Sequence, residues 1–204
     1  LTGLLAYSRA EIERNLPGWF PDTMRATIAE ITEAKTLEIH ESFMSLATQS
    51  LPQAKVHWID DQGDADRLVI QHSRLFDVLV LGQYEQLPQA SEFMLHPDKI
   101  AERSGRPLLL TPTHYAQDYI NDCAVLAWDG GDSAAKAAMS SIPYLKTKKS
   151  VHVVTVRASK PQKTQADEAL RNQLLRHGID ASFVTLDPVR HSISKAIVQF
   201  CQEV

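Results

Sequence analysis

Three consecutive residues, Asp129, Gly130 and Gly131, are of types that could bind a ligand and lie at a position that would suit one. They follow an apolar run over 124–128 and precede an alanine-rich stretch over 132–146. A carboxylate at the end of a strand can accept hydrogen bonds from a ribose or a base, and glycine amides at a helix start can hold phosphate. The alternative role is structural, because aspartate often begins a turn or caps a helix. The residues alone leave both roles open.

The sequence gives weaker support for a metal site or a nucleophilic catalytic site. The eight histidines include no pair at the four-residue spacing of a helical metal site, and no nucleophile elbow of the form Gly-x-Ser-x-Gly occurs. Cys123 and Cys201 lack the spacing of a zinc site or a disulfide framework, so we expect small apolar roles for them. We therefore predict no metal site and name no catalytic residue. The question of enzymatic activity stays uncertain, with a non-enzyme favoured.

Composition narrows the class of protein. The chain has 204 residues, a net charge of -4 and 44% hydrophobic residues, which suits one ordinary domain or two small ones. An acidic balance argues against a nucleic-acid binder. No apolar run approaches the roughly 20 residues that cross a bilayer, and there is no secretory leader at the start. We expect a cytoplasmic protein with no nucleic-acid or membrane partner.

Apolar runs alternate with amphipathic stretches along the whole chain. The expected strands are 1–7, 55–59, 78–82, 107–111, 123–128, 151–157 and 182–186. The expected helices are 22–47, 64–76, 132–146, 164–177 and 189–204. This alternation predicts an α/β fold with right-handed crossovers and parallel sheets. The runs 78–81, 108–111 and 124–128 are continuously apolar, which predicts strands buried on both faces.

The order of elements also contains a repeat. One series of strands and helices occupies residues 1–115, and a second series occupies 122–204. The polar stretch 113–121 joins them. We therefore predict two tandem units with these bounds.

Several short motifs resemble universal stress proteins. Asp77-Val-Leu-Val-Leu-Gly82, followed by Ser104-Gly-Arg-Pro-Leu-Leu-Leu-Thr-Pro112, resembles the end of a domain of that family. The stretch from Ala124 to Gly131, with the alanine-rich residues after it, resembles the opening strand and first helix of a next domain. The order of the motifs resembles the tandem-domain bacterial type. The resemblance implies a five-stranded parallel sheet of order 3-2-1-4-5, and many members of the family bind ATP.

The resemblance also implies that each unit is incomplete. The first unit would retain strands two to five and the second strands one to three. A missing first strand would be central in its sheet and would leave two unpaired edges. We expect the chain to be a fragment of a longer protein. The alternative is a permuted sheet in which strands 78–82 and 107–111 join strands 123–128, 151–157 and 182–186.

The resemblance places candidate nucleotide residues in both units. Asp129 stands where the family's nucleotide-contacting aspartate stands, with Gly130 and Gly131 beside it. In the first unit the family's phosphate loop, Gly-x-x-Gly, reads Gly82-Gln83-Tyr84-Glu85. A carboxylate near a triphosphate is repulsive, and a side chain there blocks close approach. Gly82 therefore belongs to a degenerate loop, and the corresponding loop of the second unit would lie past Val204.

We therefore expect a cytoplasmic regulatory or stress-response protein that binds ATP or another adenine nucleotide in its second unit. Its partners would be a further copy in a homo-oligomer, or its own second unit in a pseudo-dimer. One alternative is a nucleotide-free interaction module that dimerises. The other is a nucleotide hydrolase of the wider α/β class, for which the residues offer no acid, base or metal-holding pair.

Overall fold

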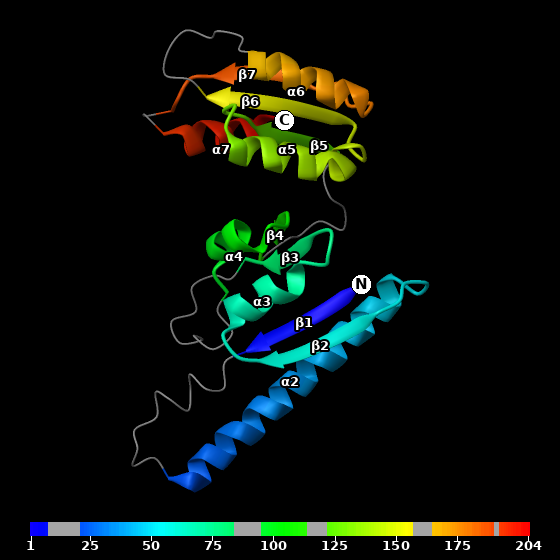
Figure 1. Ribbon diagram of the computed structural model, residues 1–204, viewed down its shortest axis with the longest axis vertical. Coiled ribbons are helices and arrows are strands. Elements are labelled where there is room, and N and C mark those ends of the chain that lie inside the picture. Colours follow the sequence, from blue (N-terminus) through cyan, green and yellow to red (C-terminus); the bar gives the residue numbers. More distant parts are fainter. Residues whose placement is uncertain (8–20, 84–94, 114–121, 157–164, 190–191) are drawn as a thin grey trace. The chain divides into compact units, whose positions relative to one another are not determined.

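The chain divides into two compact units, Leu1–Tyr115 and Ala116–Val204. The computed structural model describes residues 1–7, 21–83, 95–113, 122–156, 165–189 and 192–204 (Figure 1). Within these residues every pairing between strands is parallel. The prediction of an α/β fold with parallel sheets is confirmed.

The described residues of the first unit form four strands and three helices. In chain order they are β1 (Thr2–Tyr7), α2 (Asp22–Ser50), β2 (His57–Gln62), α3 (Ala65–Ser73), β3 (Leu79–Gly82), α4 (Pro97–Ser104) and β4 (Leu108–Thr111). The strands form two separate pairs, β1 with β2 and β3 with β4. Both pairs contribute to one apolar core, in which Ala6 of β1 and Leu81 of β3 lie with Val69 of α3 and Ile100 of α4.

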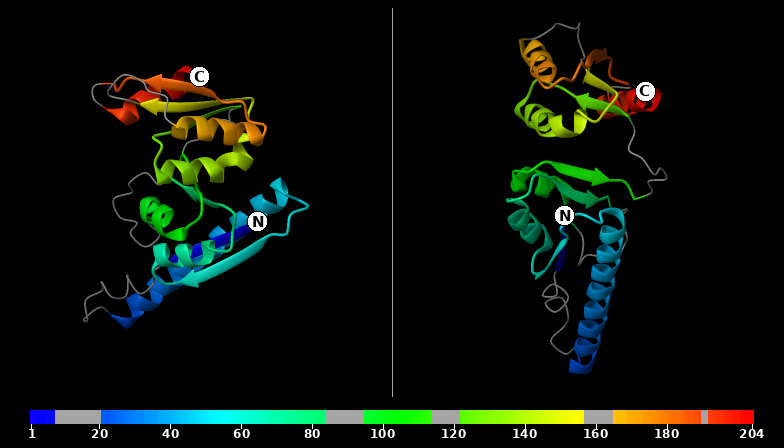
Figure 2. Two further views of the ribbon diagram at one scale, coloured as in Figure 1. Left: turned by 45° about the horizontal axis from the view of Figure 1, so that its top comes forward. Right: turned by 90° about the vertical axis from the view of Figure 1, so that its right-hand side faces the viewer.

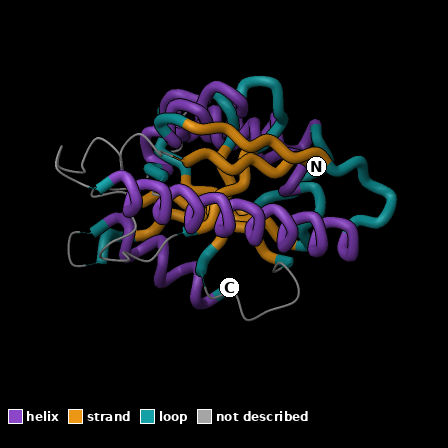
Figure 3. Tube along the Cα trace, turned by 90° about the horizontal axis from the view of Figure 1, so that it is seen from below, coloured by secondary structure: helices purple, strands orange, loops and turns teal. Residues whose placement is uncertain are grey.

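The long helix α2 runs without interruption over 29 residues (Figure 3). It begins at Asp22, as the Pro21-Asp22 pair predicts. Its second half packs on β2, where the rings of His40 and Phe43 lie 5.0 Å and 5.3 Å from the ring of Trp58. Met24 and Ile31 in the first half are exposed, so α2 is an apolar-rich helix with one side in solvent.

The prediction that β3 and β4 are buried on both faces is wrong for the described residues. Parallel register pairs Leu79 with Leu108 and Val80 with Leu109, and paired residues share a face. Leu81 is buried in the core beneath α3 and α4, but Val80 on the opposite face is 55% exposed and Leu109 is 42% exposed. Among the described residues of the first unit, these two helices cover one face of the pair, and no element of that unit covers Val80 and Leu109 on the other.

In the second unit, three strands and three helices lie within the residues that the structure describes. They are β5 (Cys123–Ala127), α5 (Asp132–Leu145), β6 (Ser150–Val156), α6 (Gln165–Arg176), β7 (Ser182–Leu186) and α7 (Ile193–Glu203). The strands form one sheet in the order β5-β6-β7. Helices α5 and α6 lie on one side of this sheet and α7 lies on the other (Figure 2). Helix α6 stops just before Gly178, whose φ of +77° suits glycine and fits the predicted end.

The core of the second unit lies between its sheet and the helices α5 and α6. Val153 of β6 is 1% exposed and Leu174 of α6 is not exposed at all. Leu126 of β5 and Ile142 of α5 belong to the same cluster. The strand order 3-2-1-4-5 of a full five-stranded sheet stays a prediction, and so does the permuted alternative. Each described sheet has only two or three strands.

Candidate functional site

The predicted residues Asp129, Gly130 and Gly131 form a tight turn between β5 and α5. The Asp129 Oδ1 atom accepts a hydrogen bond of 2.8 Å from the backbone N–H of Gly131. Gly130 has φ of +79°, a left-handed conformation that glycine adopts without strain. Asp129 therefore has the structural role in a turn that was one of its two possible roles in the sequence. All three residues are exposed, and the second carboxylate oxygen, Oδ2, has no hydrogen bond to the described residues.

Trp128 anchors this turn to the sheet. Its side chain is buried, its backbone N–H donates to the Val154 carbonyl at 2.8 Å, and its indole Nε1 donates to Asp167 Oδ1 at 2.9 Å. The sequence analysis missed Asp167, which lies in the first turn of α6. Buried indoles usually find a hydrogen-bond acceptor, so Trp128 itself was a signal that an acceptor must lie near the end of β5.

The start of α5 presents backbone N–H groups next to the turn. Gly131 is the N-cap, and no side chain caps the helix. Such N–H groups attract anions. Asp132, an acidic residue in the first turn of α5, directly follows Gly131 and reduces this attraction. The arrangement is better suited to accepting hydrogen bonds from hydroxyl groups than to holding several phosphates.

Gly82 of the first unit lies at the end of β3, beside the end of β4. The Gln83 N–H donates to the Thr111 carbonyl at 2.7 Å, and the hydroxyls of Thr111 and Thr113 donate to the Leu81 and Gln83 carbonyls. A side-chain carbon at Gly82 would meet the Thr111 hydroxyl at 4.0 Å, an ordinary contact. The described neighbours do not require glycine here. Glu85, which made this loop degenerate in the sequence analysis, lies outside the described residues.

The Gly-Arg-Pro motif that resembles the stress-protein family has a structural role in the first unit. Gly105 ends α4 with φ of +67°. The Arg106 guanidinium donates to the carbonyl of Arg74 at the end of α3, with a distance of 3.0 Å from Nε. The Pro107 carbonyl accepts from the Leu79 N–H at 3.0 Å. The motif thus ends one helix, ties it to another and starts the pairing of β3 with β4.

A second polar cluster joins α3 to α4 in the same unit. The Asp66 carboxylate accepts from the His96 backbone N–H at 2.9 Å and lies 2.8 Å from its Nδ1. The Lys99 Nζ lies 3.9 Å from the same carboxylate. Helix α4 begins at Pro97, a residue suited to the first position of a helix, so His96 lies directly before the helix. Asp66 therefore fixes the start of α4.

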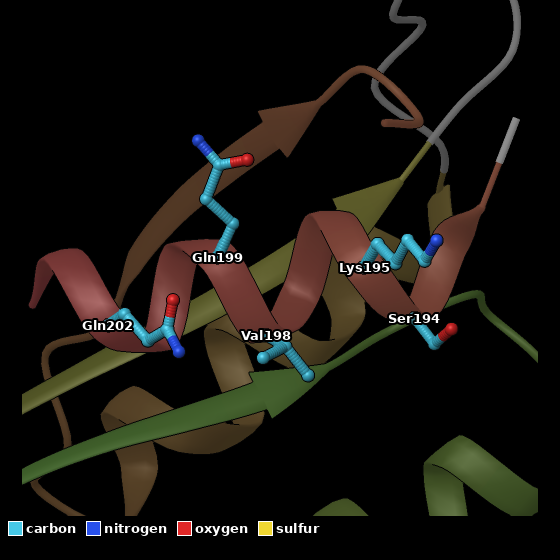
Figure 4. A pocket seen from close by; sticks show the side chains of 5 residues that line it. All are labelled: Ser194, Lys195, Val198, Gln199 and Gln202. Carbon is cyan, nitrogen blue, oxygen red and sulfur yellow. The ribbon is translucent and has the colours of Figure 1, made fainter. Parts of the chain in front are cut away.

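The described part of the chain contains no group of three or more His, Cys, Asp and Glu side chains placed to hold a metal ion. A shallow pocket lies on α7, lined by Ser194, Lys195, Val198, Gln199 and Gln202 (Figure 4). Its lining comes from a single helix, and it includes none of the predicted site residues. None of the described helices is long and apolar enough to cross a membrane.

Comparison with known proteins gives a structural likeness. A crystal structure of a universal stress protein from Archaeoglobus fulgidus is similar to this chain with a TM-score of 0.65 and 16% identity. The match covers 99% of this chain and 70% of the other. No protein-family model matches the sequence, and no curated protein is significantly similar to it. At this low identity the likeness shows that the chain shares the α/β fold of that protein.

Proposed function

We propose that the chain is a regulatory protein of universal stress type, built from two tandem units, and that its second unit binds an adenine nucleotide. The turn from Asp129 to Gly131 is the binding element. The likeness of fold supports the family assignment. The residue bounds 1–115 and 122–204 are the proposed copies, each holding part of the five-stranded order 3-2-1-4-5.

One observation carries the nucleotide proposal. Asp129 is held at the carboxyl end of β5 with one oxygen fixed by the Gly131 N–H and the other directed to no described partner. In open α/β sheets, ligands bind beyond the carboxyl ends of the strands. A carboxylate oriented in this way can accept hydrogen bonds from both hydroxyls of a ribose. Gly130 keeps the neighbouring backbone free of side chains, so a sugar can approach closely.

The charges around the turn define which part of the nucleotide this element recognises. Asp132 would repel phosphate, whereas a ribose and a base carry no charge. We therefore assign the ribose to Asp129. The described residues should make most of their contacts with the adenosine part of the nucleotide, which ATP and AMP share with adenosine itself. Gly82 of the first unit belongs to the phosphate loop, a different element from the turn at Asp129, and its degenerate loop predicts no triphosphate there.

The second candidate function is a nucleotide-free module that associates with a further copy of itself. A specific observation favours it: the Asp129 carboxylate already has a structural partner in the Gly131 N–H, so the turn needs no ligand to be stable. Under this alternative the chain would form a homo-oligomer in the cytoplasm and purify without nucleotide. Enzymatic turnover is not part of either proposal.

Isothermal titration of ATP, AMP and adenosine into the full chain tests the proposal. Asp129→Ala should weaken binding of all three by about tenfold or more, because hydrogen bonds to a charged group contribute about 1.5–3 kcal/mol. Asp129→Asn retains an oxygen that can accept from Gly131 and should weaken binding to a similar degree, which separates ribose recognition from collapse of the turn.

Asp132→Ala is the matched control, since it removes the same charge three residues away. It should leave adenosine affinity unchanged and strengthen ATP binding slightly. Equal losses in the Asp129 and Asp132 variants would assign the effect to general electrostatics. A wild-type chain that binds none of the three ligands would overturn the proposal and favour the nucleotide-free module.

A further inference from the structure

The two cysteines of the chain lie on the same side of the second sheet, Cys123 on β5 and Cys201 on α7. Side chains alternate along a strand, and Ala124 and Leu126 of β5 face the core beneath α5 and α6. Cys123 and Val125 therefore face the opposite side. The parallel register pairs Val125 with His152 of β6, so His152 shares the face of Cys123.

Helix α7 covers this same face. The ring of Phe200 packs edge-on against the ring of His152, with 5.6 Å between their centroids. Figure 4 shows α7 running from Ser194 to Gln202 against the direction of the β5 arrow. The helix thus proceeds toward the beginnings of the strands, and Cys201 follows Phe200 directly. Cys123 is the first residue of β5. It therefore lies two residues nearer the beginning of the strand than Val125, which pairs with His152.

Electrostatics agrees with this placement of the two thiols. Burial raises the pKa of the Cys201 thiol, and the charge of the Cys123 thiolate raises it further. A through-space interaction of this kind requires the two groups to lie near each other. Cys201 is exposed and Cys123 is half-buried, so a small reagent can reach Cys201 first.

We propose that Cys123 and Cys201 are a redox pair that closes into a disulfide and ties the last turn of α7 to the start of β5. The oxidant is a low-molecular-weight disulfide. This site is independent of the nucleotide proposal, because it lies at the opposite ends of the strands from Asp129. Helix ends open readily, which allows the last turn of α7 to bring its sulfur into bonding geometry.

The chemistry is two successive thiol–disulfide exchanges. The exposed Cys201 thiolate attacks one sulfur of the small disulfide, whose S–S bond breaks and releases one small thiolate. The Cys123 thiolate then attacks the Cys201 sulfur of the mixed disulfide and releases the second small thiolate. The two protons lost by the cysteines are taken up by these thiolates. In sum, two protein thiols are oxidised by two electrons, and one small disulfide is reduced to two thiols.

The test treats the full chain with oxidised glutathione, blocks remaining thiols with an alkylating reagent, and measures intact mass and proteolytic peptides. We expect a monomer that loses about 2 Da and both alkylation sites, with a cross-linked peptide that joins Cys123 to Cys201. Reductant should restore both sites. Two stable glutathione adducts without the cross-link, or disulfides between chains, would overturn the proposal.

Single serine variants make the assignment specific. Cys123→Ser should stop at a mixed disulfide with glutathione on Cys201, because the resolving thiol is absent. Cys201→Ser should react with glutathione at least tenfold more slowly than the wild type, because the remaining Cys123 thiol is half-buried. The closed wild-type chain should melt several degrees higher than its reduced form, about 4–8 °C, and neither variant should show this shift. An equal rise in melting temperature in the variants would contradict the proposed disulfide between Cys123 and Cys201.

Discussion

The second unit joins its three strands in one sheet, whereas the first unit divides its four strands into two pairs. The second core contains eleven buried residues, from Leu126 to Ala181, and the first contains five, from Ala6 to Ile100, among the described residues. The same alternation of strand and helix therefore yields unequal packing. A parallel sheet gains its core from contiguous strands with helices on both faces, and the second unit meets both conditions over its described residues.

The difference predicts unequal stability. With fewer buried apolar side chains and bare faces on its strands, the first unit should open at a lower free energy than the second. Local opening can be measured segment by segment by native-state hydrogen exchange.

The largest effects are expected in the two cores. Leu174→Ala in the second unit and Ile100→Ala in the first remove fully buried side chains, and each should cost about 2–5 kcal/mol. Hydrogen exchange should accelerate in the unit that carries the substitution and stay unchanged in the other. Acceleration in both units by either variant would show that they unfold together and would break the comparison.

Two neighbouring residues of β3 test the bare face of the first unit. Leu81→Ala should destabilise that unit by about 2–3 kcal/mol, because Leu81 lies in the core. Val80→Ala should cost less than about 1 kcal/mol, since its side chain is half exposed. Thermal melts with exchange data measure both. Equal losses in the two variants would mean that Val80 is covered in solution and that β3 is buried on both faces after all.

The link between α3 and α4 should contribute less. Asp66→Ala removes the acceptor of the His96 N–H and should destabilise the first unit by about 1–2 kcal/mol. Asp98→Ala, an exposed acid in the first turn of α4, is the control and should cost under about 0.5 kcal/mol. If the control proves as damaging, the effect belongs to helix charge and not to the Asp66–His96 contact.

A glycine pair in the second unit separates binding from folding. Gly130→Ala and Gly178→Ala both force a side chain into positive φ and should each cost about 1–2 kcal/mol. Adenosine affinity should fall for Gly130→Ala alone, because Gly178 lies after α6. Loss of binding in both variants would indicate that stability, and not the turn at Asp129, controls affinity.

The smallest effect is expected at Lys149, which pairs with Asp122 at 2.5 Å on the surface. The hydrogen bond and charge of Asp122 raise the Lys149 pKa. Its contribution is therefore complete below the ordinary value of 10.5 and is lost as pH rises through the higher folded pKa. Lys149→Ala should leave the melting temperature unchanged at pH 7, and a clear drop would contradict the view that exposed pairs contribute little.

Much of the fold was predictable, because apolar runs and helix-breaking residues determine the secondary structure of their own segment of the chain. The apolar run before Asp129 predicted β5, and the amphipathic stretch before Gly178 predicted α6. What covers Val80 was not predictable, because continuous apolarity shows what a strand can bury and not which elements are present to bury it. The Trp128–Asp167 hydrogen bond was also missed, since its partners stand 39 residues apart and only the crossover of β6 brings them together.

The candidate site was predictable to the level of the turn. The residue types at 129–131 indicated a sharp connection between a strand and a helix, and the structure has one. The two roles left open for Asp129 were not separable from sequence, because the same carboxylate geometry serves an Asx turn and a sugar. Here both can operate at once, with Oδ1 in the turn and Oδ2 toward a ligand.

Hydrogen exchange with and without ATP tests the central claim most directly, since it compares the two units in one experiment. Binding at the second unit should slow exchange in the segment 128–135 and leave the segments around Gly82 and Thr111 unchanged. Equal protection of both units, or no protection of 128–135 at saturating ATP, would contradict the assignment of the nucleotide site to Asp129, Gly130 and Gly131.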